Sequence, residues 1–137
     1  MYPEELVAPM KEDLTQAGFE QLTSSEAVDQ AINNTPGTTF MVINSVCGCA
    51  ASNARPAAKM AIENAKSPQN IVTVFAGVDT DAVNQARKYT LPYPPSSPSM
   101  ALFKDGKLVH FIERHHIEGR AAEMIADNLK MAFDEFC

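Results

Sequence analysis

Two cysteines separated by a single glycine are the residues of this sequence best suited to chemistry. Cys47, Gly48 and Cys49 lie in the stretch INSVCGCAASNARP, between an apolar run and a segment rich in small residues. A thiolate can attack a disulfide, and a second thiol nearby can resolve the mixed disulfide that results. We therefore interpret the pair as a thiol–disulfide exchange site.

Two other interpretations of the pair stay open. Both cysteines could be small buried hydrophobic residues, although the glycine between them fits core packing poorly. They could instead bind a metal ion. Zinc requires four ligands, whereas Cu(I) is satisfied by two soft sulfurs. The alternative function is therefore a non-enzymatic metal-thiolate binder or carrier that uses the same C-x-C pair. The three histidines, His110, His115 and His116, lie far along the sequence from this pair.

The position of Cys47 favours an ionised sulfur. An apolar run ends just before it, which places it at the carboxyl end of a strand, where α/β sheets hold their ligands. If Cys47 is the N-cap of the next helix, the amides of Cys49 and Ala50 point at its sulfur, and the helix dipole stabilises the thiolate. Gly48 removes side-chain bulk beside the sulfur and permits unusual backbone dihedrals.

Length, charge and hydropathy limit what the whole chain can be. Its 137 residues fit one domain, which we expect to span residues 1–137. A net charge of −6 argues against nucleic acid as a partner, because binding to the phosphate backbone needs a basic face. Neither a signal-peptide pattern nor an apolar run of the ~18 residues needed for a membrane span is present, so we expect a cytoplasmic protein with no membrane partner.

The cysteine count agrees with a cytoplasmic location. Three cysteines are an odd number and do not make a framework of structural disulfides. In a reducing compartment, closely spaced cysteines are more often catalytic or metal-binding. The count therefore favours chemistry at the C-x-C pair over a structural bridge.

Two buried strands are predicted on either side of the cysteine segment. The runs at Thr39–Ile43 and Ile71–Phe75 are apolar and β-favouring, and the more continuously apolar first run should be the central strand. Between them, apolar residues return at helical spacing, and Pro56 should kink that helix or end its first segment. A strand, a helix and a strand in this order predict a right-handed βαβ crossover.

Two helices are predicted ahead of the first strand. The first contains Pro9, which should kink or divide it. The second is expected to begin with a capping box formed by Thr23 and Glu26 and to end near Asn33-Asn34. One face of the first helix should be buried, through Leu6, Met10 and Leu14.

After the second buried strand, the pattern predicts a helix, a hairpin and a final helix. Asp79 can cap a helix that runs through Tyr89, and Asp105-Gly106 between apolar runs indicates a hairpin turn. An apolar stripe over residues 122–136 predicts the last helix. The fold class is therefore α/β, with a central mixed four-stranded sheet (βαβ, helix, ββ hairpin, helix), helices on both faces and two extra N-terminal helices.

A Ser-Pro pair and the cysteine segment together point to a known fold. Pro98 follows Ser97 and leads into the first hairpin strand, where an X-Pro bond can be cis. A reactive cysteine at a strand end, a kinked helix and this Ser-Pro pair resemble the thioredoxin fold. Over essentially the whole chain, including the final Cys137, the sequence resembles the bacilliredoxins, through NSVCGCAASNARPAA, FAG, PSSPSMALFKDGKLVHFI and RHHIEG.

The resemblance implies a function and the residues that carry it. Bacilliredoxins are thioredoxin-like thiol–disulfide oxidoreductases that remove the small thiol bacillithiol from client proteins, and members have been regarded as disulfide isomerases. By that likeness Cys47 attacks and Cys49 resolves, while Gly48, Ser97 and Pro98 bind the substrate. No bound cofactor is implied: bacillithiol is a co-substrate, and S-bacillithiolated proteins are the partners. The chain departs from ordinary thioredoxins in having C-x-C in place of C-x-x-C.

Several other polar residues have weaker expectations. Cys137 is expected to be a tail thiol that is not catalytic, and the cluster at residues 113–116 a solvated surface, with substrate recognition as the second alternative. Arg55 lies two turns beyond Cys47, too far to stabilise its thiolate directly. Asn44 and Asn53 are candidate donors near the sulfur without an assigned role.

Overall fold

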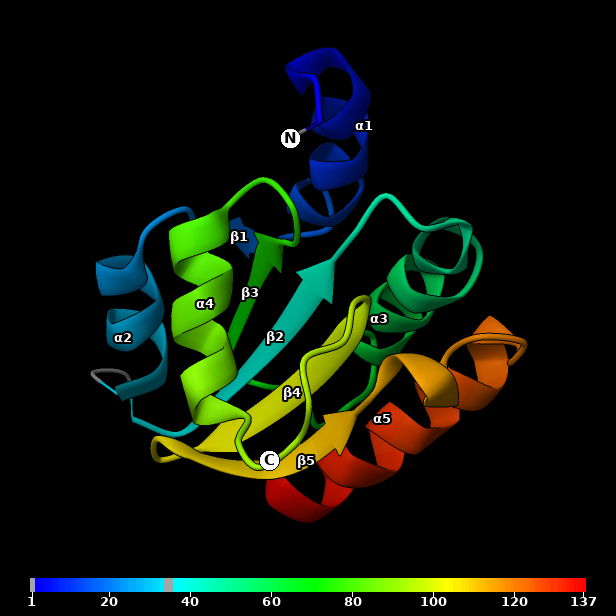
Figure 1. Ribbon diagram of the computed structural model, residues 1–137. Coiled ribbons are helices and arrows are strands. Elements are labelled where there is room, and N and C mark those ends of the chain that lie inside the picture. The colour runs from blue at the N-terminus through cyan, green and yellow to red at the C-terminus, as the bar shows by residue number, and fades with distance from the viewer. Residues whose placement is uncertain (1, 34–35) are drawn as a thin grey trace.

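A single mixed sheet forms the centre of the protein (Figure 1). Over residues 2–33 and 36–137, which the computed structural model describes, five strands pair in the order β1-β3-β2-β4-β5. Their bounds are β1 (Glu20–Gln21), β2 (Thr38–Asn44), β3 (Asn70–Phe75), β4 (Ser99–Lys104) and β5 (Lys107–Ile112).

The strand that precedes the cysteines is the central one, as predicted. β2 pairs in parallel with β3 and antiparallel with β4, and each of its seven residues is buried. Because successive side chains of a strand point to opposite faces, Phe40 and Val42 belong to one core cluster, whereas Met41 and Ile43 belong to the other. The sheet is therefore covered on both sides.

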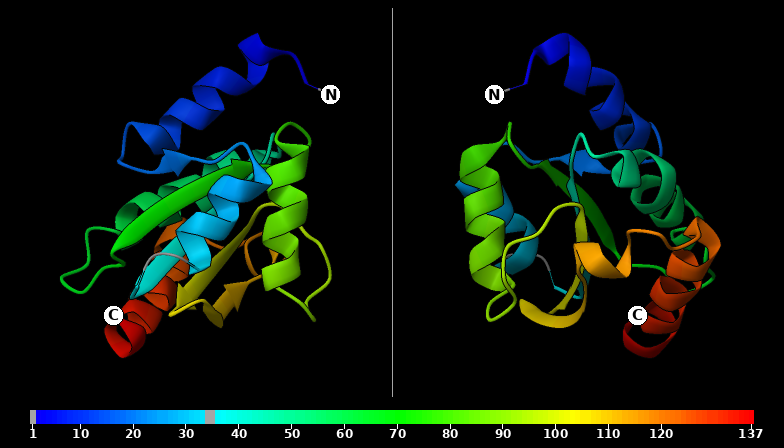
Figure 2. Two further views of the ribbon diagram at one scale, coloured as in Figure 1. Left: turned by 90° about the vertical axis from the view of Figure 1, so that its left-hand side faces the viewer. Right: turned by 45° about the vertical axis from the view of Figure 1, so that its right-hand side comes forward.

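Helices supply both covering layers (Figure 2). α3 (Arg55–Ala61) and α5 (Ala122–Phe136) cover one face, and α2 (Ser25–Asn33) and α4 (Thr80–Tyr89) cover the other. α5 buries the predicted stripe almost completely, with only Phe136 partly exposed. α1 (Glu4–Thr15) lies beyond the carboxyl ends of β2 and β3, where the Lys11 ammonium stands 6.0 Å from the centre of the Phe75 ring.

Of the two effects predicted for Pro9, a kink or a division of the first helix, division was wrong. α1 continues through Pro9, whose missing N–H cannot donate the hydrogen bond of a regular helix. The accepting carbonyl would belong to Glu5, which is exposed and can be solvated instead. The expected buried face is also shifted, because Val7 and Leu14 are buried and Leu6 is 46% exposed.

Two predicted helix caps differ from the structure. α2 is capped by Ser24, whose Oγ accepts the amide of Ala27 at 3.1 Å, so the cap lies one residue after Thr23. α2 ends at Asn33, as predicted, and Asn34 is outside the described residues. Asp79 does occupy the N-cap position of α4, but its carboxylate makes no capping bond and instead accepts the amide of Phe75 and the side chains of Gln21 and Lys11.

The predicted hairpin is present, and the sheet has one strand more than predicted. Asp105 and Gly106 have φ of 51° and 82°, the left-handed values of a two-residue type I′ turn between β4 and β5. The additional strand is β1, which pairs with β3 through Glu20 and Gln21 only. Two residues cannot show a periodic pattern, so the sequence carried no signal for this edge strand.

Candidate active site

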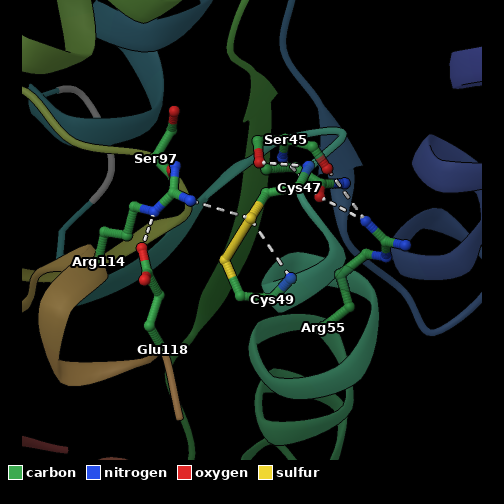
Figure 3. The surroundings of a disulfide bond; sticks show 8 residues. Ser45, Cys47, Cys49, Arg55, Ser97, Arg114 and Glu118 are labelled. Atoms are coloured by element: carbon green, nitrogen blue, oxygen red, sulfur yellow. Dashed lines mark hydrogen bonds and ion pairs between the residues drawn. A yellow bond between two sulfur atoms is a disulfide. The ribbon is translucent and has the colours of Figure 1, made fainter.

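A Cys47–Cys49 disulfide stands at the carboxyl end of the central strand (Figure 3). The two Cα atoms are 5.3 Å apart, within the range of about 4.4–6.8 Å that is usual for disulfides. Cys47 and Cys49 are partly exposed and Gly48 is exposed. The pair is therefore not part of the buried core, and a visiting molecule can reach it.

The backbone around Cys47 directs one amide at its sulfur. The N–H of Cys49 donates to Cys47 Sγ at 3.3 Å, as predicted. The amide of Ala50 does not, because it donates to the Cys47 carbonyl at 2.9 Å and so begins the helix. On the other side, the Cys47 amide donates to Ser45 Oγ at 3.0 Å and fixes the loop that leaves β2.

The helix that follows the cysteines begins with a wide turn. Ala50–Ala54 is π-helical, and regular α-helix starts only at Arg55. Pro56 has no N–H to donate to the carbonyl of Ser52, so regular α-helical bonding is interrupted at this point. The prediction that Pro56 ends the first segment of this helix is confirmed.

Gly48 does not use the unusual backbone dihedrals that a glycine permits. Its φ lies outside the left-handed region, so a side chain there would not strain the backbone. Apart from its two chain neighbours, no residue has an atom within 4 Å of where a Cβ would lie at this position. The glycine therefore leaves open space beside the disulfide and is not required by the local backbone.

Arg114, which was predicted to lie in a solvated surface cluster, contacts the sulfur of Cys47. The Nη2 of Arg114 donates to Cys47 Sγ at 3.2 Å, and its Nη1 donates to the Ser97 carbonyl at 3.2 Å. Its Nε donates to Glu118. The spacing of Arg114 and Glu118, four residues apart, was the only sequence signal of this pairing, and nothing in the sequence placed it beside residue 47.

The Ser-Pro pair lies next to the disulfide. The Ser97–Pro98 peptide bond is cis, as predicted, and Pro98 is buried at the start of β4. The guanidinium of Arg114 bridges the Ser97 carbonyl and the Cys47 sulfur, so the loop before β4 and the loop after β2 meet at this point (Figure 3). The structure thus brings together all five residues that were predicted for the site.

A buried network anchors the loop from behind. Arg55, only 5% exposed, donates to Asn44 Oδ1 at 3.0 Å, to the Ser45 carbonyl at 3.3 Å and to Asp13 Oδ2 at 3.0 Å. The expectation that Arg55 does not reach the sulfur is consistent with these partners. The amide groups of Asn44 and Asn53 donate to the carbonyls of Met10 and Arg120, so neither serves the sulfur.

The charge of Asp13 is stabilised within this network. Partial burial raises the pKa of its carboxyl, but hydrogen bonds from Lys59 and Arg55 and their positive charges outweigh that effect. The pKa of Asp13 is therefore held below its ordinary value of 3.8. The ion pair joins α1 to α3 directly behind the cysteine loop.

A candidate metal-binding cluster lies apart from the cysteines. Among the described residues, the side chains of Glu113, His115 and His116 place three ligand atoms within 4.8 Å of one another. This cluster contains neither cysteine, and in the described parts of the chain no group of three metal-ligating side chains includes them. A four-ligand zinc site at the C-x-C pair is therefore not formed by these residues.

A hollow between β5 and α5 does not include the cysteine pair. It has a volume of about 410 Å³ between β5 and α5, and its polar lining includes His110, His116 and Asn128. Neither Cys47 nor Cys49 is among its lining residues. The hollow and the partly exposed disulfide are therefore separate features of the surface.

Cys137 is remote from the disulfide. α5 starts near the site, since the Asn53 side chain donates to the carbonyl of Arg120, just ahead of that helix. Its 15 residues then carry the chain roughly 22 Å away at 1.5 Å per residue. Cys137 is exposed and unpaired at that far end.

None of the helices in residues 2–33 and 36–137 is long and apolar enough to span a bilayer.

Comparison with known sequences gives full-length matches. A family model described as "Disulphide isomerase" matches residues 2–137. A bacilliredoxin of Cytophaga hutchinsonii is 64% identical over 135 residues, covering 98% of this chain and 99% of that protein. A bacilliredoxin of Bacillus cereus is 53% identical over 137 residues, covering 99% and 95%, and one of Koribacter versatilis is 47% identical, covering 100% and 94%.

Comparison with solved structures identifies the fold. Mitochondrial thioredoxin 3 from Saccharomyces cerevisiae in its oxidised form superimposes with a TM-score of 0.61 at 16% identity, covering 90% of this chain and 98% of that one. The thioredoxin of Fasciola hepatica gives a TM-score of 0.61 at 18% identity, covering 87% and 100%. The predicted thioredoxin-like α/β fold is therefore confirmed.

Proposed function

Because this chain belongs to the bacilliredoxin family and is a thiol–disulfide oxidoreductase, we propose that it removes bacillithiol from mixed disulfides on client proteins in the cytoplasm. The observation that carries the proposal is the sulfur of the partly exposed Cys47, which faces an amide and a guanidinium and has a second cysteine two residues away. Donors of this kind favour a thiolate, which is the attacking species.

The first step is attack by Cys47. In the reduced protein, the Cys47 thiolate attacks the bacillithiol sulfur of the client's mixed disulfide. A new S–S bond joins Cys47 to bacillithiol, the client S–S bond breaks, and the client cysteine leaves as a thiolate that takes a proton from water. The client is freed in its reduced form, with no net change in the number of disulfides.

The second step releases the small thiol. The Cys49 thiolate attacks Cys47 Sγ, bacillithiol leaves as a thiolate, and a Cys47–Cys49 disulfide forms, which is the state seen in the structure. Two external thiols must then return two electrons to the pair, and they leave joined as their own disulfide. If Cys47 attacks a disulfide within a client and a client thiol displaces it, the same chemistry isomerises disulfides.

Three residues are proposed to receive the substrate. Gly48 has open space in place of a side chain, so a client chain can approach the disulfide over it. Ser97 lies within reach of the same guanidinium as Cys47, and Pro98 fixes the backbone beside it. The backbone of Ser97 and the ring of Pro98 would therefore border a disulfide bound at Cys47.

Adduct transfer tests the proposal directly. The Cys49→Ala protein, reduced and mixed with an S-bacillithiolated client, should stop after the first step and retain bacillithiol on Cys47, read as an intact-mass increase of one bacillithiol. A Cys47→Ala/Cys49→Ala protein is the control and should remain unmodified. Failure of the adduct to move, with both variants folded, would contradict the proposed function. Protection of both thiols that only a chelator removes would favour the metal carrier instead.

A further inference from the structure

We propose that Arg114 is a catalytic residue, a guanidinium that contacts the Cys47 sulfur and stabilises its thiolate in the reduced protein. The proposal rests on the function proposed above only in taking Cys47 as the attacking residue. Its starting point is the distance of 3.2 Å between Arg114 Nη2 and Cys47 Sγ. An ionised acceptor strengthens such a hydrogen bond, so this contact favours the thiolate over the thiol.

Arg114 is held in place by three further contacts, two from its guanidinium and one from its backbone amide. Nη1 donates to the Ser97 carbonyl at 3.2 Å, and Nε donates to the Glu118 carboxylate. The backbone amide of Arg114 donates to Ser96 Oγ at 3.4 Å. A planar fork with donors on several sides suits this arrangement, and a lysine ammonium could not make all of these contacts at once.

The backbone turn that carries Arg114 also helps to orient its side chain toward the Cys47 sulfur. Arg114 opens a short 3-10 turn, Arg114–His116, directly after β5. The turn is closed at its start by Glu113, whose side chain accepts the amide of His116 while His116 Nδ1 accepts the amide of Glu113. The backbone at Arg114 is therefore fixed before its side chain extends toward Cys47.

Among the charged groups that the structure describes near Cys47, Arg114 is the cation that contacts the sulfur. From α3, Arg55 approaches the same loop, but its guanidinium is paired with Asp13 of α1 and bonds Asn44 and the Ser45 carbonyl. The loop before β4 contributes Ser96 and Ser97, which are uncharged. In the 3-10 turn, the carboxylate of Glu113 faces His115 and His116.

Glu118 reduces the effect of Arg114 without cancelling it. Its carboxylate pairs with Nε, whereas the sulfur contact is made by Nη2. Both side chains are close to half exposed, at 44% and 52%, so water and salt screen part of the attraction. We therefore expect an effect smaller than that of a fully buried pair.

The test measures the charge of Cys47 without client or bacillithiol. In a Cys49→Ala/Cys137→Ala background, Cys47 is the only thiol, and its rate of alkylation by neutral iodoacetamide is followed against pH. Adding Arg114→Gln should raise the midpoint of this profile by roughly one pH unit. Arg114→Lys should raise it by less, because the charge is kept while the fork is lost. Arg120→Gln, an exposed arginine of the same segment, is the matched control and should leave the midpoint unchanged.

A second readout separates an electrostatic role from a structural one. With both cysteines of the pair present, loss of thiolate stabilisation should move the equilibrium with reduced glutathione several-fold toward the Cys47–Cys49 disulfide, because the reduced state is the one that Arg114 favours. An unchanged midpoint and an unchanged equilibrium in a folded Arg114→Gln protein would overturn the inference. The adduct-transfer experiment would be unaffected by that result, because Cys47 can attack without Arg114 at sufficiently high pH.

Discussion

At the scale of single residues, the space beside the disulfide matters as much as the sulfurs. Gly48 is exposed and has no left-handed φ, and a Cβ added to it would have no neighbour within 4 Å. Other glycines of this chain differ, since Gly77 has a φ of +83° and a Cβ there would come within 2.8 Å of the Tyr2 ring. The backbone conformation at position 48 thus does not require glycine, and what Gly48 provides is open space beside the disulfide.

This difference between Gly48 and Gly77 predicts different losses of stability for the two alanine substitutions. Gly48→Ala should change the free energy of unfolding by no more than about 0.5 kcal/mol. Gly77→Ala should lower it by about 1–2 kcal/mol, because a Cβ is unfavourable in the left-handed region. Urea unfolding of both variants measures the two effects. Equal losses would show that Gly48 has a backbone role after all.

A bulkier residue at position 48 tests the proposed route for clients. Gly48→Leu should slow bacillithiol removal from a protein client by at least about tenfold, since reacting atoms must approach within contact distance. Alkylation by iodoacetamide should be nearly unaffected, because that molecule is small. A parallel fall in both rates would instead locate the effect at the sulfur itself.

Residue chemistry was the part of the site that could be predicted most readily. Cys47 and Cys49 stand out because their spacing is local in the sequence and their position after an apolar run is readable. Arg114 could not be found, because it comes from a segment 67 residues away and makes its contact only after the sheet has formed. The direction of one amide was also missed, since helix initiation at Ala50 competes for it.

At the scale of secondary-structure elements, the first helix is tied to the cysteine loop. Asp13 of α1 pairs with Arg55 and Lys59 of α3, and Arg55 continues to Asn44 and the Ser45 carbonyl. The cation at the centre of this chain of contacts is 5% exposed and depends on Asp13 for its counter-charge. α1 therefore helps to hold the loop that carries Cys47.

Removal of the Asp13 charge should destabilise the protein in a pH-dependent way. At pH 7, Asp13→Asn should cost about 1–2 kcal/mol of unfolding free energy, because Arg55 loses its charged partner while Asp13 itself is partly solvated. The pKa of Asp13 is lowered in the folded state, so its contribution is present above the unfolded pKa near 4 and is lost as the pH falls through the folded pKa.

Thermal unfolding from pH 7 down to pH 2 measures this contribution. The difference between the native sequence and Asp13→Asn should shrink below about pH 4. Asp127→Asn, on the exposed face of α5, is the matched control and should match the native sequence throughout. A difference that stayed constant across this range would rule out the charge of Asp13 as its cause.

The elements differed in how well their patterns predicted them. β2, β3 and α5 were predicted because long periodic or fully apolar runs must be buried in one particular way. Helix ends were less predictable: Ser24 competes with Thr23 for the cap, and tertiary contacts draw the Asp79 carboxylate away from α4. β1 could not be predicted, because its two residues form a strand only by pairing with β3 and show no strand pattern of their own.

At the scale of the whole molecule, the redox site and the third cysteine are at opposite ends of α5. The site is assembled from the loop after β2, the loop before β4 and the turn after β5. Near the other end of α5, Asp134 accepts a hydrogen bond from Asn64, which lies beyond the end of α3. The separation of roughly 22 Å between the ends of α5 is too great for Cys137 to reach Cys47.

Substitution of Cys137 should therefore leave the chemistry intact. Cys137→Ser is expected to keep kcat/KM for bacillithiol removal within about twofold of the native value, since no group at the site is altered. Steady-state assays with one S-bacillithiolated client compare the two proteins. A larger loss would show that Cys137 takes part in resolution, either in a second molecule or after a large movement of α5.

The sequence distance between Arg114 and Cys47 has a consequence for the nascent protein. During synthesis Cys47 emerges 67 residues before the guanidinium that contacts it. Arg114 follows β5, so its contact with Cys47 requires β4 and β5 to have joined the sheet. Under the role proposed for Arg114, an unfinished chain therefore lacks this stabilisation of the Cys47 thiolate and gains it only on completing its fold.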